Sequence, residues 1–455
     1  MPAPRPAPPL YRSFGLLACL ALPAEAQTLS VTTLADEFDG ACTAQHCSLR
    51  EAISAANASP DQPSLILLGA GTYQLSLANG LDAQGWPREE NANLTGDFDL
   101  LGQVTILGVG PEQTLIDSKR LDRLFDVQPD ASLSLRGLTL TGGLSVYDGG
   151  GIRNHGTLQA LDVTLRDNRA YAYVTNVQSR GGALANFATA QLHRVRLENN
   201  LVDGGDMTMG QGGALYNEGT LQVRDSRIER NLCIDYHEVG MGCGLLNRGV
   251  ADLARVALIG NRAGPDGMGG AILNLGSLTL ANATLSDNYG GGKGAALDNG
   301  DRYNPQPTGT PNATLVHVTI AENDGYGLIN KDGTVSLRNV IIAGNRERET
   351  GEPRNCLQQD SAVAMNVRGL LLGSDAGNCT GSISVDNDQV LVRELFPLAE
   401  NNGTLAHALR RTSAALDSAE GACASHDQRR LTRPRDGDGD GIARCDLGAF
   451  ERAGP

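Results

Sequence analysis

Apolar and polar positions in this 455-residue chain alternate over short runs, and the runs return at a regular period. The period is marked by pairs of asparagines 14 positions apart, and successive pairs begin 32, 31, 30 and 27 residues apart. These pairs are Asn154 and Asn168, Asn186 and Asn200, Asn217 and Asn231, Asn247 and Asn261, and Asn274 and Asn288. A repeat of this kind predicts a solenoid, in which each unit buries its apolar face only against its neighbours.

Aligning the repeats on the first asparagine gives two columns that are apolar throughout. Two positions before it stand Ile152, Leu184, Leu215, Leu245, Ile272, Leu297 and Leu328. Eleven positions after it stand Leu165, Leu197, Ile228, Leu258 and Leu285, continued by Ile320 and Ile342. The apolar runs between these columns are too short and too often interrupted by glycine for helices. Each repeat is therefore predicted to form three short strands.

Three short strands per turn, each stacked on its equivalent in the next turn, predict an all-β fold: a right-handed parallel β-helix with rungs about 4.8 Å apart. The hand follows from the right-handed preference of parallel crossovers. A buried asparagine at a strand corner can bond the asparagines above and below it and tolerates left-handed backbone. The asparagine columns are therefore interpreted as stacking ladders rather than as ligands.

A further column, eight positions after the first asparagine, changes sign from rung to rung. It reads Asp162, Arg194, Asp225, Arg255 and Asn282. Opposite charges on neighbouring rungs stabilise a sheet by about 0.2–1 kcal/mol per pair. We expect an exposed ladder of charges on a solvated face.

The N-terminal residues 1–26 have the pattern of a secretory signal peptide. Arg5 and Arg12 precede an apolar stretch from Phe14 to Leu22, and Ala24-Glu25-Ala26 forms a small-residue cleavage site before Gln27. Cys19 leaves a lipoprotein signal as the alternative. Both interpretations predict export, either as a secreted protein or at the outer cell surface.

Eight cysteines follow the predicted signal and fall into near neighbours: Cys42 with Cys47, Cys233 with Cys243, Cys356 with Cys379, and Cys423 with Cys445. An even count in an exported chain indicates disulfides, and a stiff solenoid favours local pairs among the 105 possible pairings. A metal site made by Cys42, His46 and Cys47 is a poor alternative in an oxidising compartment.

The ends of a solenoid need caps, because the outermost rungs expose apolar side chains and strand edges. Ser48 and Glu51 have the spacing of a capping box, which predicts a short N-terminal helix with an apolar face formed by Leu49, Ile53 and Ala56. The expected organisation is a signal peptide at 1–26, an N-terminal cap at 27–96, β-helix repeats at 97–385 and a C-terminal closing segment at 386–455. Further early rungs are expected between Asp97 and Gly142.

The formal charge of −15 argues against nucleic acid and anionic lipid as partners. No apolar stretch reaches the 18 residues that a spanning helix needs. The expected partners are an extracellular polysaccharide or a surface protein, and the expected state is a monomer.

The segment Cys47-Ser-Leu-Arg-Glu-Ala52 resembles the CSLREA domain of exported bacterial β-helix proteins. The ending from Asp436 to Glu451 is similar to the choice-of-anchor Q domain that often closes such proteins. The Gly-Gly-Ala-Leu sequences at 181 and 212 and Gly-Gly-Ala-Ile at 269 resemble the repeats of polymorphic outer membrane proteins, with Leu or Ile in place of the phenylalanine of the partner Phe-x-x-Asn motif. The resemblance implies a β-helix and export, and it implies no settled activity.

An acidic run near the C-terminus carries the strongest signal for a metal. Asp436, Asp438 and Asp440 alternate before Gly441, as in the first half of a calcium loop. Leu447 stands where an EF-hand has its acidic twelfth residue, so Asp446 or a distant group would complete the shell. We predict a structural calcium here, and the alternative is an acidic, solvated turn held by Cys445.

Catalytic signatures are missing from the sequence. It contains no nucleophile elbow, zinc helix or phosphate-binding loop, and the histidines never pair at ligand spacing. The parallel β-helix fold, in its pectin-lyase-like form, hosts polysaccharide lyases and glycoside hydrolases, so an enzyme of that class is the alternative. No set of acids is identified as catalytic.

The inserted loops at 169–180, 201–211, 232–241 and 262–268 leave the repeat at the same corner and therefore line one edge. They carry residues suited to stacking on sugar rings or contacting a protein: Tyr171, Tyr173, Asp203, Asp206, Tyr236 and His237. Loops at exposed corners also tolerate insertions without any ligand. We predict a non-catalytic secreted or surface protein that acts in adhesion or carbohydrate contact.

Overall fold

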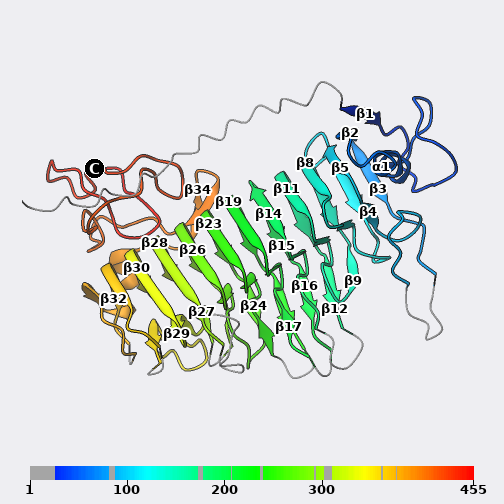
Figure 1. Cartoon of the computed structure of the whole chain (residues 1–455). Coiled ribbons are helices and arrows are strands. Elements are labelled where there is room, and N and C mark those ends of the chain that lie inside the picture. Colours follow the sequence, from blue (N-terminus) through cyan, green and yellow to red (C-terminus); the bar gives the residue numbers. More distant parts are fainter. Residues whose placement is uncertain are drawn as a thin grey trace, which may run out of the picture.

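The computed structural model describes residues 26–80, 88–172, 178–205, 208–235, 239–291, 294–301, 310–359, 362–375 and 377–454. Over these residues the chain forms a right-handed parallel β-helix, which confirms the predicted fold class. The coil runs from its N-terminal cap, at the right of Figure 1, to the last rungs near residue 385, at the left.

Three parallel sheets form the walls of the coil. The first sheet runs along its whole length and contains β1 Gln27–Ser30, β2 Ser64–Leu67, β3 Gly71–Gln74, β5 Gln103–Leu107, β6 Thr114–Asp117, β8 Ser132–Thr141, β11 Thr157–Arg166, β14 Thr189–His193, β15 Arg196–Glu198, β19 Thr220–Glu229, β23 Val250–Ile259, β26 Ser277–Ser286, β28 Asn312–Ala321, β30 Thr334–Ala343, β32 Asn366–Gly373 and β33 Ile383–Val385.

The second sheet contains β4 Phe98–Leu100, β7 Phe125–Val127, β10 Ile152–Asn154, β13 Leu184–Asn186, β18 Leu215–Asn217, β22 Leu245–Asn247, β25 Ile272–Asn274, β27 Ala295–Asn299, β29 Tyr326–Asn330 and β31 Cys356–Gln358. The third sheet contains β9 Leu144–Val146, β12 Arg169–Tyr171, β16 Leu201–Asp203, β20 Leu232–Ile234 and β24 Arg262–Ala263. A smaller sheet pairs β17 Gly210–Gln211 with β21 Gly240–Met241.

Both asparagine columns form the stacking ladders that the sequence predicts. From Asn154 to Asn330, each Nδ2 donates to Oδ1 of the asparagine on the next rung at 2.6–3.0 Å. The second ladder runs from Asn168 to Asn387 at 2.8–3.1 Å. All of these side chains are buried. Their amides therefore satisfy one another where water does not reach.

The predicted charge column lies at a left-handed bend that divides each long strand of the first sheet. Asp162, Arg194, Asp225, Arg255 and Asn282 have φ between 50° and 56°. The column continues as His317 and Asn339 at 51° and 58°. An extra residue with positive φ bends a strand and turns its side chain away from the core. This bend separates the two apolar columns within each repeat.

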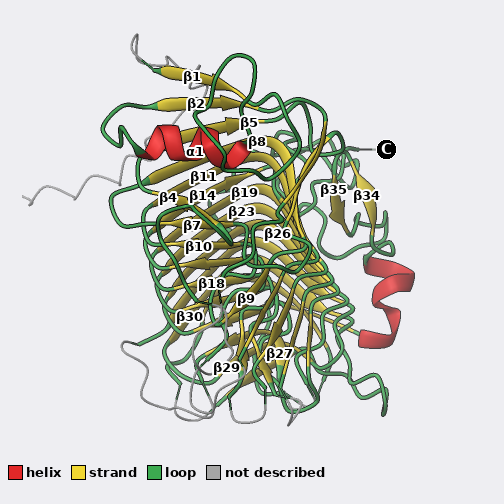
Figure 2. Ribbon diagram, turned by 90° about the vertical axis from the view of Figure 1, so that its right-hand side faces the viewer, coloured by secondary structure: helices red, strands yellow, loops and turns green. Residues whose placement is uncertain are grey.

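The N-terminal cap has the predicted helix, α1 Leu49–Asn57, with its capping box. Ser48 Oγ accepts the Glu51 N–H at 3.1 Å, and Glu51 Oε2 accepts the Ser48 N–H at 2.9 Å. The helix lies across the first rungs (Figure 2), and its side chains Leu49, Ile53 and Ala56 belong to the buried core. Each of the four predicted cysteine pairs is a disulfide.

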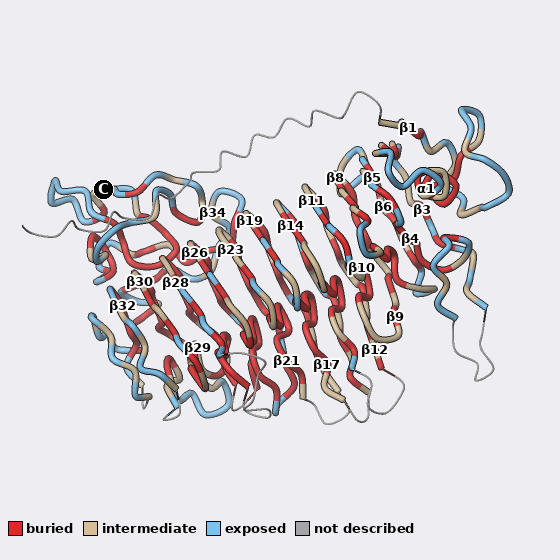
Figure 3. Tube along the Cα trace, in the orientation of Figure 1, coloured by how far each residue is buried: buried red, intermediate tan, exposed pale blue. Residues whose placement is uncertain are grey.

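The C-terminal segment folds back along the outer face of the first sheet (Figures 1 and 2). It contains a 3₁₀ turn Asn387–Gln389, a π-helical turn Val390–Glu394 and a hairpin of β34 Ala399–Asn401 with β35 Thr404–Ala406. Its apolar side chains pack on outward-facing residues of the later rungs, among them Ala321, Ile341, Ala343 and Leu371. Along the strands of the middle rungs of this sheet, buried residues alternate with more exposed ones (Figure 3).

Candidate functional site

A groove of about 480 Å³ lies between the first sheet and the edge of the C-terminal segment that packs on it. One wall is the bend of the middle rungs, with Arg194, Val195, Arg196, Asp225, Ser226, Arg227 and Arg255. The opposite wall comes from the C-terminal segment, with Asn402, Gly403, Thr404, Gln428, Arg429 and Arg430. Six of these residues are arginines, and each of them forms an ion pair with a neighbouring acid.

The outward positions of the first sheet explain why the groove begins at these rungs. In β15 and β19 these positions carry Arg196, Arg227 and Glu229, whereas in β28 and β30, three and four rungs after β19, they carry Ala321 and Ile341. Apolar outward residues need a cover, and the C-terminal segment supplies it. Charged outward residues do not need such a cover, so the C-terminal segment ends beside them.

The predicted charge column forms ion pairs between successive rungs. Arg194 Nε and Nη2 each lie 2.6 Å from a carboxylate oxygen of Asp162. Arg255 Nε and Nη2 lie 2.5 and 2.8 Å from the two oxygens of Asp225. Both pairs have the two-pronged geometry that arginine and a carboxylate favour. The alternation of charge predicted from the sequence is confirmed at these rungs. The predicted exposure holds for Asp162 and Arg194, whereas the Asp225 side chain is only 10% exposed.

The C-terminal segment adds a third arginine to this ladder. Arg430 Nε lies 2.9 Å from Asp225 Oδ1, and its Nη2 lies 3.3 Å from His193 Nε2. Burial acts to raise the pKa of Asp225, but hydrogen bonds from Arg255 and Arg430 outweigh it and hold the pKa well below its usual range. Burial and the charge of Arg194 lower the pKa of His193. Asp225 is therefore ionised and His193 is neutral at pH 7.

The groove offers donors for anions. The side chains of Arg194, Arg196 and Arg430 are 44%, 45% and 54% exposed, although each is also paired with an acid. A guanidinium has five N–H donors, so an exposed, paired arginine can still bind a carboxylate or sulfate. Asp225 pairs with two arginines. Because its pKa is low, it holds these arginines in place and does not act as a proton donor.

The predicted ligand edge is described at two of its six residues. Tyr171 and Asp203 are register partners on β12 and β16, and both are half-buried. Arg169 joins them, because its Nη2 lies 2.7 Å from Asp203 Oδ2 and its guanidinium carbon lies 5.6 Å from the Tyr171 ring centroid. Tyr173, Asp206, Tyr236 and His237 lie outside the described residues.

The acidic loop brings two of its predicted ligands together. Asp436 and Asp438 offer oxygens within 4.8 Å of each other and of Asp417, a residue that the sequence analysis did not identify. Asp440 lies outside this group; its Oδ1 accepts the Ile442 N–H at 2.7 Å. The predicted disulfide between Cys423 and Cys445 was the signal that could have placed Asp417 near the loop.

Asp446 also lies outside that group. It is buried, and its two oxygens accept the N–H groups of Asp417 at 2.9 Å and Arg452 at 2.6 Å. Burial and the neighbouring charge of Glu451 raise the pKa of Asp446 to about 7. Beside it, Arg433 Nη1 and Glu451 Oε2 form a fully buried ion pair of 2.6 Å. Asp446 thus belongs to the network that holds the closing segment together.

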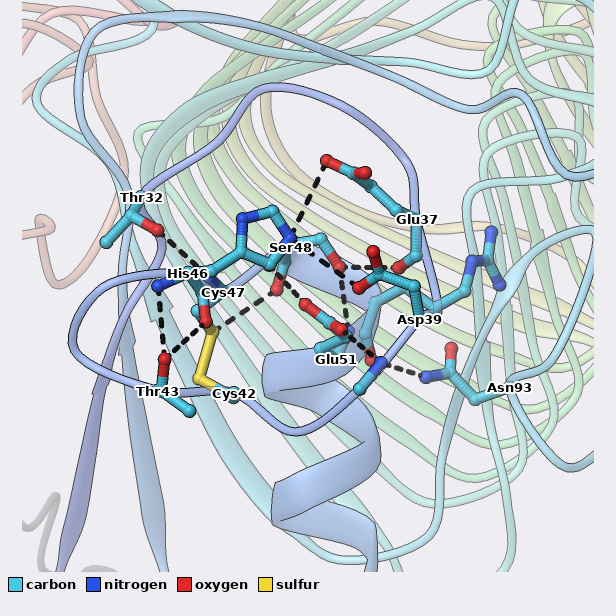
Figure 4. Close-up of a disulfide and its surroundings, with 12 residues drawn as sticks. Thr32, Glu37, Asp39, Cys42, Thr43, His46, Cys47, Ser48, Glu51 and Asn93 are labelled. Atoms are coloured by element: carbon cyan, nitrogen blue, oxygen red, sulfur yellow. Dashed lines mark hydrogen bonds and ion pairs between the residues drawn. A yellow bond between two sulfur atoms is a disulfide. The ribbon is translucent and has the colours of Figure 1, made fainter.

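The cysteines of the alternative N-terminal metal site are occupied by their disulfide. Figure 4 shows Cys42 and Cys47 joined beside the start of α1. His46 Nε2 lies 3.8 Å from Glu37 and 3.7 Å from Asp39, and these three side chains are at least one-third exposed. These three side chains lie together at the surface of the cap.

The chain matches no family model and no curated protein sequence. Among solved structures it is similar to the pectate lyase Pel9A, at 15% identity over 94% of this chain and 97% of that chain, with a TM-score of 0.49. It is also similar to the A-module of the mannuronan C-5 epimerase AlgE4 from Azotobacter vinelandii, at 16% identity over 74% and 94% of the two chains, with a TM-score of 0.27. In the part of the chain that the structure describes, helices are all too short or too polar to cross a membrane.

Proposed function

We propose that this protein is exported and binds an acidic polysaccharide, without cleaving it, in the arginine-lined groove between the middle rungs and the C-terminal segment. The observation that carries the proposal is the set of half-exposed arginines at Arg194, Arg196 and Arg430 along the groove. Each of these guanidinium groups can bind one carboxylate, so the groove can hold several anionic groups of one polymer.

Charge and shape support the same partner. The chain as a whole carries −15, yet arginines are concentrated along this groove and offer N–H donors to anions there. The groove is open to solvent, as a polymer that extends beyond the site requires. The four disulfides are compatible with an extracellular role.

The chemistry of the groove favours binding over catalysis. Asp162 and Asp225 are paired with arginines, and the low pKa of Asp225 leaves it without a proton to donate. The alternative, a lyase or hydrolase for acidic polysaccharides, requires a base or a pair of acids placed beside the bound sugar. We therefore propose adhesion or retention of the polymer as the role of this surface.

The proposal is tested by the affinity for polygalacturonate and alginate, with neutral glucan as a reference ligand. The double variant Arg194→Gln/Arg430→Gln should weaken binding to the acidic polymers by at least about tenfold, since each lost charge-assisted bond is worth about 1.5–3 kcal/mol before solvent screening. Arg348→Gln is the matched control, because Arg348 is 57% exposed and forms ion pairs with Asp287 and Asp324 outside the groove. Equal binding by the double variant and the control would contradict the proposal that the polysaccharide binds in the groove.

We also propose that a structural calcium binds the C-terminal loop through Asp417, Asp436 and Asp438. This set replaces Asp440 and Asp446 of the sequence-based hypothesis, because the three carboxylates converge within 4.8 Å. Such a calcium would tie the loop to the segment before Cys423. The resemblance to exported CSLREA proteins supports the signal peptide and the export, which stay predictions.

A further inference from the structure

Outward-facing aspartates occupy the first two rungs of the second sheet. β4 and β7 pair in register, with Phe98 opposite Phe125 and Asp99 opposite Asp126. The phenylalanines face the core, so the aspartates between them and the next apolar residues point to the outside of the coil. Asp97, just before β4, joins them, and one carboxylate oxygen from each of the three residues lies within 4.8 Å of the others.

These outward carboxylates are nevertheless buried. Asp97, Asp99 and Asp126 are 2%, 0% and 1% exposed. The loop before β4 covers them: the Asn93 N–H donates to Asp99 Oδ2 at 3.0 Å, and Asn91 Oδ1 accepts from Gln128 Nε2 at 3.2 Å. Asn93 Nδ2 also reaches the Arg50 carbonyl of α1 at 2.9 Å (Figure 4). The cluster therefore lies at the junction of the N-terminal cap and the coil.

Two of the three carboxylates have a cationic partner. Asp97 Oδ2 lies 2.7 Å from Arg123 Nε, and Asp126 Oδ1 lies 3.0 Å from Arg153 Nε. A third arginine, Arg50, pairs with the Asp36 carboxylate at 2.7 Å and donates to the Asp97 carbonyl at 3.2 Å. Asp99 is left with the Asn93 N–H.

An unsatisfied oxygen is the second, independent sign of a ligand. Within the described residues, Asp99 Oδ1 has no hydrogen-bond partner although its side chain is completely buried. Asn93, which bonds the other oxygen of Asp99, has a buried Oδ1 that is likewise without a partner in that part of the chain. A buried ionised oxygen without a donor is costly unless a proton or a cation occupies the space beside it.

The pKa values of two of the aspartates in the cluster are raised, as expected where buried carboxylates lack enough neighbouring positive charge. Burial, with the charges of Asp126 and Glu90, raises the pKa of Asp99 to about 7. Burial also raises the pKa of Asp97, against the opposing effect of Arg123. Oxygens from three converging carboxylates are what a hard divalent cation such as calcium prefers, and magnesium more rarely accepts such an all-protein site.

We infer that a divalent cation of the calcium class binds between Asp97, Asp99 and Asp126 and joins the N-terminal cap to the first rungs of the β-helix. The cation takes the place beside Asp99 that no arginine occupies. This site is independent of the arginine-lined groove and of the acidic loop near the C-terminus, and it does not rest on the proposed function.

The test uses calcium as the probe and the whole purified chain in an Asp438→Asn background, which removes the C-terminal loop as a site. Isothermal titration should still find one bound calcium per chain. The melting temperature should rise by roughly 2–5 °C when calcium is about 100-fold above its Kd. Adding Asp99→Asn should abolish both signals, whereas adding Asp162→Asn, in the exposed column, should leave them unchanged.

Two outcomes would overturn the inference. An Asp438→Asn chain that binds no calcium would show that a proton or nothing stabilises Asp99, and this result does not depend on whether any cluster variant folds. An Asp438→Asn/Asp99→Asn chain that keeps its calcium and its rise in melting temperature would place the ion elsewhere. Far-ultraviolet circular dichroism of each variant separates loss of the ion from loss of the fold.

Discussion

Aspartate and arginine face outward on neighbouring rungs in two regions of this coil, with different results. In the column of alternating charge, Asp162 pairs with Arg194 and Asp225 with Arg255, and these side chains are between 10% and 45% exposed. At the N-terminal end, Asp99 and Asp126 are adjacent, and a loop buries them. The comparison shows that burial by a covering loop decides whether outward-facing charged residues form a solvated surface or a site that requires a counter-charge.

The largest difference should appear when an arginine is removed from each region. Arg123→Met leaves Asp97 buried without its partner, and loss of one member of a buried pair costs about 3–5 kcal/mol in free energy of unfolding. Arg194→Met breaks an exposed pair and should cost less than about 1 kcal/mol. Chemical denaturation of both variants measures the difference. Similar losses would contradict the distinction between the two regions.

The second difference concerns pH in calcium-free buffer. The folded-state pKa of Asp99 is raised above its unfolded value, so the folded chain binds more protons between about pH 4 and 7 and loses stability as pH rises through this window. Asp99→Asn should remove this loss, which we expect to be roughly 2–4 kcal/mol. Buried His317 and His407, whose pKa values are lowered by burial, act in the opposite direction below about pH 6.5. The comparison of the variant with the parent chain isolates Asp99.

Asp225, in the column of alternating charge, provides a control for the measurement of stability against pH. The low pKa of Asp225 provides stability above its unfolded pKa, near pH 4, and that stability is lost on acidification. Asp225→Asn should therefore change the melting temperature at pH 7 in calcium-free buffer without flattening its decline between pH 5 and 7. A decline that is the same in the parent and Asp99→Asn chains would count against a charged Asp99.

The asparagine ladder, which is as buried as the acidic cluster but uncharged, should give a loss that does not depend on pH. Asn231→Ala removes the Oδ1 acceptor of the Asn200 N–H and Nδ2 and the side-chain donor to the Leu197 carbonyl, at a cost of about 1–3 kcal/mol. Because no titrating group is involved, the loss should be equal at pH 5 and pH 8. Urea denaturation at the two pH values measures it, and a loss confined to one of them would imply a charge near the ladder.

Local and repeated features were predictable from the sequence. The asparagine spacing predicted both ladders, Ser48 and Glu51 predicted the capping box, and the cysteine spacing predicted the four disulfides. These features depend on contacts within a repeat or between neighbouring rungs, where the period itself fixes which residues meet.

The two sites depended on contacts that the period does not fix. Arg430 meets Asp225 only because the C-terminal segment folds back over rungs about 200 positions earlier in the chain. The acidic cluster had a signal in the repeated triplets Phe98-Asp99-Leu100 and Phe125-Asp126-Val127, but these rungs lack the asparagine pairs that marked the period. Its burial also requires the loop before β4, which no periodic pattern predicts.

The most direct test of the proposed function follows binding and turnover in one reaction. The purified chain, with calcium present, is incubated with polygalacturonate, alginate and neutral glucans, and bound polymer, unsaturated products and new reducing ends are measured together. The account predicts that acidic polymers bind, that Arg194→Gln/Arg430→Gln reduces this binding, and that no products form. Products from any polymer, or equal binding of acidic and neutral polymers, would contradict it.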